Sequence, residues 1–287
     1  MTATTSSAPP AARAPAKGQV MAQAGSENFP VASYLLGRRQ RGHLLAIYGF
    51  ARLVDDIGDE VPGDRLALLD WLEGELDQLY ADRCPEHPIM RSLAAAVAEC
   101  ALPRQPFERL IEANRRDQTI TRYETFDELL DYCQLSAAPV GELVLHVFGA
   151  ATPERIELSD RICAGLQITE HLQDVDEDYR RGRIYLPRQD IERFGCDEAE
   201  LDAQPRSESW RALIAHETGR ARSLLAAGAP LVHTLGLRPR LAVAGFLAGG
   251  RAALRDLERS GYERSAAEHH GSKRYFYGAW AKAVTGR

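Results

Sequence analysis

The chain has 287 residues, of which 45% are hydrophobic and 26% are charged, a balance that is ordinary for a soluble protein with a sizeable core. This composition excludes a chain that is disordered throughout, and it excludes a fibrous repeat. The formal net charge of −6 provides no basic surface for DNA or RNA, so we expect no nucleic-acid partner.

The first 25 residues are rich in Ala, Pro, Ser and Thr and carry no apolar periodicity. They also lack the apolar core of a secretory signal, so residues 1–25 are predicted to form a disordered tail. The most apolar later stretch, Leu241–Gly250, has ten residues, whereas a membrane-spanning helix needs about 20. We therefore expect a cytoplasmic protein without a transmembrane segment.

Residues 26–287 are predicted to form one all-α domain, an antiparallel helical bundle around a central cavity. From Asn28 onward, apolar residues recur at spacings of three and four, which is typical of amphipathic helices. The prolines lie mainly between these stretches or at their edges, where a helix tolerates them. Helices are expected around residues 44–54 and over 65–80, 89–101, 106–116, 126–149, 154–179, 209–227, 238–259 and 274–284.

The first functional pattern lies near the end of the first expected helix. Spacings of four, three and four residues place four side chains on one helical face: Tyr48, Arg52, Asp55 and Asp59. Asp55 and Asp59 repel each other at this spacing, which costs an isolated helix about 0.2–0.5 kcal/mol. The helix macrodipole adds to that cost near a C-terminus, so this helix needs a nearby cation.

A second acidic pattern follows 119 residues later, far enough along the chain to lie on a different helix. Spacings of three, four and four residues again place four side chains on one face: Gln167, Glu170, Asp174 and Asp178. Both patterns therefore contain Asp-x-x-x-Asp. Both also lie next to apolar sequence whose periodicity directs the helices toward the interior of the protein.

Most acidic runs are solvated helix faces, and that is the simplest alternative explanation. The shared spacing and the apolar surroundings favour two buried stripes that face each other. Buried carboxylates need compensating cations, and hard oxygen ligands select Mg²⁺ or Ca²⁺ rather than zinc. The stripes therefore predict a magnesium-bridged diphosphate site. A di-iron site would need Glu-x-x-His, and the spacing of Glu142 and His146 does not match it.

The two motifs resemble those of the squalene/phytoene synthase family, in which the second motif runs into a segment like Tyr-Arg-Arg-Gly-Arg-Ile-Tyr-Leu-Pro187. The resemblance covers about residues 28–259. Two further segments, Glu27–Ser33 and Thr121–Gly141, resemble the bacterial hopanoid-pathway branch of this family, whose members act as hydroxysqualene synthases. The resemblance implies an isoprenoid-synthase fold and a magnesium-dependent ionisation of presqualene diphosphate. Rearrangement of the cation and quenching by water would then give hydroxysqualene and diphosphate.

The resemblance also implies roles for individual residues. Two or three Mg²⁺ ions would be held by the motif aspartates Asp55, Asp59, Asp174 and Asp178. Catalytic positions near the diphosphate or the cation would be Tyr48, Tyr132, Gln167 and Glu170. Substrate-binding positions would be Phe29, Arg52, Arg183 and Tyr185. Glu170 stands where the family commonly has Asn, and this extra carboxylate would add a metal ligand, act as a base on water or accompany a different substrate geometry.

Two other functions are compatible with the same residues. One is the head-to-head condensation of two prenyl diphosphates, as in presqualene diphosphate or phytoene synthases, and the other is a non-catalytic assembly factor on the same fold. No dinucleotide fingerprint is present and the chain ends at Arg287 without a hydrophobic anchor, so no NADPH-dependent reduction to squalene is expected. The expected partners are a lipophilic prenyl diphosphate, a loosely contacted membrane surface and neighbouring enzymes of the pathway.

Overall fold

The computed structural model describes residues 13–22, 37–201, 203, 205–263 and 283–284. The described part is predominantly helical, and its only β contact is an isolated parallel bridge between Arg122 and Ile184, so the all-α prediction is confirmed. The elements are α2 (Lys17–Ala22), α3 (Arg38–Asp59), α4 (Arg65–Tyr80), α5 (Pro88–Cys100), α6 (Gln105–Arg116), α7 (Phe126–Ser136), α8 (Ala138–Val147), α9 (Pro153–Gln173), α10 (Val175–Arg180), α11 (Arg188–Arg193), the 3₁₀ helix η2 (Glu198–Glu200), α12 (Glu208–Gly228), α13 (Leu231–Thr234) and α14 (Leu237–Arg259).

Several helices begin where the sequence supplies a capping side chain. The side-chain oxygens of four N-cap residues accept a hydrogen bond from the backbone N–H three residues later, at 3.0–3.5 Å: Asp64, Thr125, Thr152 and Ser207. Helices α5, α6, α8 and α9 each carry a proline in the first turn. Proline is favourable there because its missing N–H would have no partner within the helix.

Two of the expected helices are each divided in two. The stretch 126–149 breaks at Ala137, because Pro139 has no N–H to continue the earlier helix and instead lies in the first turn of α8. The stretch 154–179 breaks at Asp174, between α9 and α10. This break places three acidic residues in the first turn of a new helix, where the macrodipole favours carboxylates. The expected helix at 274–284 lies outside the described residues, apart from 283–284.

Part of the expected disordered tail is ordered. Lys17–Ala22 form α2, which packs against α3, and Val20 has no exposed surface. The prediction of disorder does not hold for these residues, because a short helix with little periodicity of its own is stabilised by packing on a longer one. Residues 1–12 and 23–25 of the same segment lie outside the described part of the chain.

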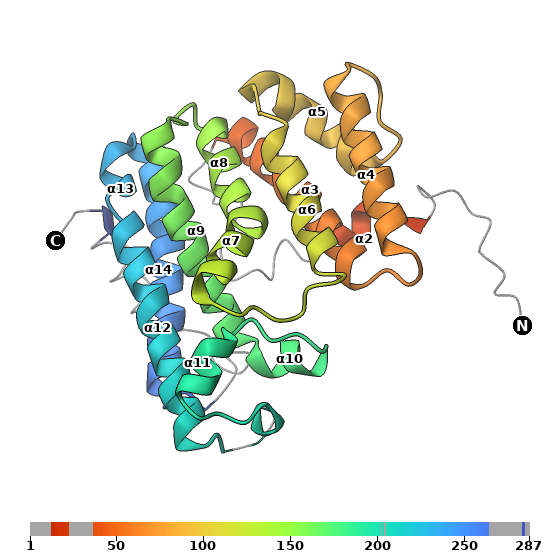
Figure 1. Cartoon of the computed structure of the whole chain (residues 1–287). Coiled ribbons are helices and arrows are strands. Elements are labelled where there is room, and N and C mark those ends of the chain that lie inside the picture. The colour runs from red at the N-terminus through yellow and green to blue at the C-terminus, as the bar shows by residue number, and fades with distance from the viewer. Residues whose placement is uncertain (1–12, 23–36, 202, 204, 264–282, 285–287) are drawn as a thin grey trace, which may run out of the picture.

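The described helices form two groups with α8 between them (Figure 1). One apolar core gathers side chains from α2–α6, and the other gathers side chains from α7 and from α9 onward, together with Ala113 of α6. Helix α8 contributes to both cores, with Leu143 and Val147 in the first and Leu145 in the second. The most extensive helix pair is α9 against α12. Among the described residues, no helix is both long and apolar enough to cross a bilayer.

The α9–α12 contact provides a test of this packing. A Cβ added at Gly228 would lie 2.6 Å from the backbone oxygen of Leu158, and backbone atoms cannot rotate out of the way. We therefore expect Gly228→Ala to destabilise the protein by about 1–3 kcal/mol, the usual cost of overpacking. Gly219→Ala in the same helix meets no atom within 4 Å and should stabilise by up to about 1 kcal/mol. Urea unfolding measures both, and equal effects of the two substitutions would contradict the packing.

Candidate active site

A cavity of about 360 Å³ lies between α3 and α9, and residues from α6, α7, α8, α13 and α14 complete its wall. Most of the lining is apolar, including Leu44 and Phe246, and the volume falls within the roughly 300–1,000 Å³ range of small-molecule sites. Five residues predicted from the sequence meet in this one wall: Tyr48, Arg52, Asp55, Gln167 and Glu170.

The first motif is held against α6. Asp55 Oδ1 accepts a hydrogen bond from Asn114 Nδ2 at 3.1 Å. The two helices come this close because Gly58 has no side chain, and a Cβ there would lie 2.1 Å from Asn114 Oδ1. Asp55 keeps accessible surface because it borders the cavity. Burial raises the pKa of Asp55 to about 6 and the charge of Asp59 adds to the rise, although the Asn114 hydrogen bond opposes it.

The two arginines predicted to contact substrate already have acidic partners. Arg52 Nε lies 2.7 Å from Asp56 Oδ1, one turn along the same helix, and its Nη2 lies 3.0 Å from Glu60 Oε1. Arg183 Nη1 lies 2.7 Å from Asp59 Oδ1. The backbone N–H of Arg183 also donates to the carbonyl oxygen of Asp178 at 2.8 Å. Arg183 therefore connects the first motif to the second.

A histidine that sequence reasoning did not select lies beside the second motif. His171 Nδ1 lies 3.9 Å from Asp178 Oδ2, and His171 Nε2 lies 3.3 Å from Gln167 Nε2. His171 therefore joins the cavity wall to the end of the acidic stripe. Asp174 is half-buried between α9 and α10. Its burial raises its pKa to about 6, and the neighbouring charge of Asp178 contributes to the rise.

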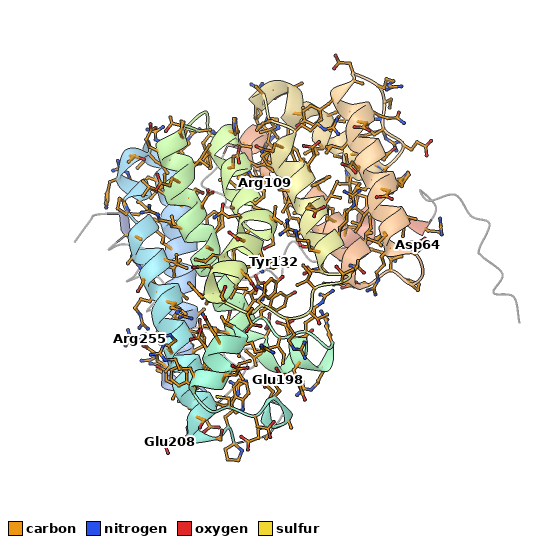
Figure 2. The ribbon with its side chains drawn as sticks, viewed as in Figure 1. Asp64, Arg109, Tyr132, Glu198, Glu208 and Arg255 are labelled. Carbon is orange, nitrogen blue, oxygen red and sulfur yellow. The ribbon has the colours of Figure 1, made fainter. Side chains whose placement is uncertain are left out.

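Tyr132 and Tyr185 lie behind the cavity wall rather than in it. Tyr132 is near the centre of the molecule in Figure 2, and its hydroxyl donates to Asp117 Oδ2 at 2.7 Å. The ring of Tyr185 stacks on His171 with 3.8 Å between centroids, and it lies 5.7 Å from the ring of Tyr132. Asp117 also accepts a hydrogen bond from Arg183 Nη2 at its backbone oxygen, at 3.4 Å.

Three of the four motif aspartates do not line the cavity. Asp59 lies one turn after Asp55 on α3, Asp174 lies one turn after Glu170 at the end of α9, and Asp178 lies on the separate helix α10. The cavity lining is mostly apolar, with Asp55 and Glu170 as its carboxylates, and we call these two residues together with Asp59, Asp174 and Asp178 the acidic end. Phe29, which was predicted to bind substrate, lies outside the described residues.

Two arginines lie among the carboxylates of the acidic end. Arg183 is shared between the motifs, and Arg52 pairs with Asp56 and Glu60, which are further carboxylates. The donor set consists of carboxylate oxygens, which fits hard divalent cations such as Mg²⁺. Among the described residues, no three of the motif carboxylates offer oxygens within 4.8 Å of one another. The geometry therefore suits ions shared with phosphate oxygens better than one ion enclosed by protein ligands.

Comparison with known proteins gives a consistent result. The profile of the family described as "Squalene/phytoene synthase" matches residues 22–274. Hydroxysqualene synthase from Rhodopseudomonas palustris is 41% identical over 209 residues, which are 71% of this chain and 70% of that protein. Hydroxysqualene synthase from Sinorhizobium fredii is 37% identical over 210 residues, which are 72% of this chain and 70% of that protein.

A solved structure shares both sequence and fold with the chain. The crystal structure of squalene synthase HpnC from Alicyclobacillus acidocaldarius superposes with a TM-score of 0.79 at 40% sequence identity, covering 89% of this chain and 100% of that chain. The fold, the matched profile and the identity to these enzymes agree. The chain therefore belongs to the squalene/phytoene synthase family of enzymes.

Proposed function

We propose that this protein ionises presqualene diphosphate in a magnesium-dependent reaction and quenches the rearranged cation with water, giving hydroxysqualene and diphosphate. The observation that carries the proposal is the acidic end of an otherwise apolar cavity, where two Asp-x-x-x-Asp motifs are joined through Arg183. The identity to two hydroxysqualene synthases supports this reaction over others of the family.

The residues of the acidic end bind and orient the leaving group. Asp55, Asp59, Asp174 and Asp178 would hold the Mg²⁺ ions, which when bound neutralise negative charge on the departing diphosphate. The guanidinium of Arg183, which pairs with Asp59 in the free protein, would donate charge-assisted hydrogen bonds to phosphate oxygens.

The body of the cavity receives the hydrocarbon chains. Its apolar lining excludes water during rearrangement, which prevents premature quenching of the cation. Tyr48 presents an aromatic side chain in the same wall, and a ring face stabilises a nearby cation. Tyr132 and Tyr185 act from behind this wall, through the ring contacts that fix His171 and hence Gln167.

Glu170 is the proposed base for the final step. It lies in the cavity wall one turn from Gln167 and retains exposed surface there. A water molecule that adds to the carbocation must lose a proton, and a carboxylate in the cavity wall can accept it. Glu170 thereby supplies a group for the water quench in a cavity that is otherwise largely apolar.

The reaction itself is the first prediction. Purified protein given presqualene diphosphate and Mg²⁺ should release hydroxysqualene, detectable by gas chromatography with mass spectrometry, and EDTA should abolish the product. Unreacted presqualene diphosphate in the presence of metal would contradict the proposal. Farnesyl diphosphate as sole substrate tests the second reaction of this family, head-to-head condensation, and a condensed product without any alcohol would favour that reaction instead.

Substitution of the motif aspartates tests the metal assignment. Asp55→Asn and Asp174→Asn should each reduce turnover by about 100-fold or more, because each removes a charged ligand. Neither substitution should lower the free energy of unfolding, since each removes a carboxylate whose ionisation burial disfavours. Asp127→Asn, at an exposed carboxylate in the first turn of α7, is the matched control and should keep full activity. Wild-type turnover in both motif variants would refute the assignment.

The pH dependence of magnesium binding follows from the same carboxyl groups. The pKa of Asp55 and of Asp174 is raised to about 6, so both groups carry protons below pH 6 and are ionised above pH 7. Mg²⁺ must displace those protons, so the concentration for half-maximal rate should rise steeply from pH 6 to pH 5 and change little from pH 7 to pH 8. Magnesium titrations of the initial rate measure this, and a flat dependence from pH 5 to pH 8 would contradict it.

A further inference from the structure

A second group of metal-type ligands lies away from the cavity, where α11 meets α12. Asp190 belongs to α11, and His216 and Glu217 are consecutive residues of α12. One ligand atom from each of these three side chains lies within 4.8 Å of the other two. Both acids are deeply buried, with 2% of Asp190 and 1% of Glu217 exposed. None of the three was selected from the sequence as a site residue.

The cluster contains buried polar atoms without a hydrogen-bond partner. Arg220 Nη1 lies 2.5 Å from Asp190 Oδ2 and 2.8 Å from Glu217 Oε1, so the guanidinium engages one oxygen of each acid. Glu217 Oε2 and His216 Nε2 are both buried, and no described N–H group donates to either of them. The carboxyl groups of Glu217 and Asp190 also contact each other through a side-chain hydrogen bond. An unpaired buried nitrogen is costly, so His216 Nε2 indicates a missing ligand beside the two acids.

The charges of the cluster also leave room for a cation. Two carboxylates face one close guanidinium, while Arg193 is largely exposed and its Nη1 lies 4.0 Å from Asp190 Oδ1. Burial raises the pKa of Glu217 to about 7, and the charge of Asp190 adds to the rise, which the charge of Arg220 opposes. Burial together with the charge of Arg220 lowers the pKa of His216, which favours the neutral imidazole that metals bind.

We propose that Asp190, His216 and Glu217 bind a divalent transition-metal ion such as Zn²⁺ at a site separate from the catalytic cavity. One imidazole nitrogen and two carboxylate oxygens form a donor set that suits Zn²⁺ better than Mg²⁺. Ligands at about 2.0–2.1 Å from one Zn²⁺ are about 3.4 Å apart, so small side-chain rotations would close the site.

The ion would serve as a structural clamp. It joins α11 to α12, and α11 follows directly after the segment that carries Arg183 and Tyr185. The backbone N–H of Arg188, the first residue of α11, donates to the carbonyl oxygen of Tyr123. The ring of Tyr123 stacks on that of Tyr185, so α11 is connected to the tyrosines that contact His171. Metal bound at Asp190 would therefore restrict the motion of the segment that carries Arg183 and Tyr185, without contacting substrate.

Zinc retention by the full-length protein tests the proposal. Protein stripped with EDTA is incubated with Zn²⁺ in the presence of excess Mg²⁺, passed through a desalting column and analysed for zinc per chain. The wild type should retain one more zinc per chain than His216→Ala and Glu217→Gln. His233→Ala, at an exposed histidine of α13, is the matched control and should retain the wild-type amount.

Cobalt spectroscopy separates this site from the catalytic carboxylates. Co²⁺ bound to an imidazole and two carboxylates in a tetrahedral site should give visible absorption bands in the wild type and in Asp55→Asn, and these bands should be lost in His216→Ala. Circular dichroism verifies that the variants fold, and Glu217→Gln provides the same reading if His216→Ala does not fold. Equal zinc content and equal cobalt spectra in the wild type and a folded variant would overturn the proposal and leave the catalytic assignment untouched.

Discussion

The ion pair between Arg183 and Asp59 connects two acidic motifs that would otherwise repel each other. The side chain of Arg183 is 13% exposed, so water and salt screen this pair less than a surface pair. The backbone of Arg183 is fixed to Asp178, which means that the second motif delivers a positive charge to the first. Arg183 pairs with only one of the four motif aspartates. The proposed magnesium and diphosphate binding follows from the carboxylates that the two motifs bring to this pair.

The carboxylates that the proposed function needs also lower the stability of the free protein. The raised pKa of Asp55 and of Asp174 means that each carboxylate is ionised at a cost in the free protein. A neutral residue at either position would remove this cost in free energy. Carboxylates that cost stability persist mainly at functional sites, where their charge is needed. The apolar lining of the cavity strengthens this conflict, because it lowers the local dielectric around the acidic end and also excludes water from a reacting cation.

The sequence predicted those site features that depend on spacing along one helix. Asp55 and Asp59 lie on one face because α3 continues unbroken through Asp59. The pairing of Arg52 with Asp56 was also readable from its spacing of four residues, but Arg52 was assigned to substrate alone. The break at Asp174 could have been foreseen from the density of acids after it, since a new helix start accommodates them better than a helix end.

Features that depend on how helices pack were not predictable from one sequence. Asn114 reaches Asp55 only because α6 approaches α3 at Gly58. Asp117 acquires its role from Tyr132, which a different element brings to it. His171 was passed over because a lone histidine on a partly apolar face is usually structural, and its contacts to Gln167 and Asp178 depend on side-chain geometry at the junction of α9 and α10.

The central claim is that the two motifs share metal ions with a prenyl diphosphate, and anomalous diffraction from Mn²⁺ tests it most directly. Crystals grown with Mn²⁺ and farnesyl thiodiphosphate would locate both the metal and the phosphate groups. We expect manganese peaks within coordination distance of carboxylate oxygens from both motifs, bridged by diphosphate oxygens at the acidic end of the cavity. Manganese absent from both motifs, with the diphosphate bound elsewhere, would contradict the account.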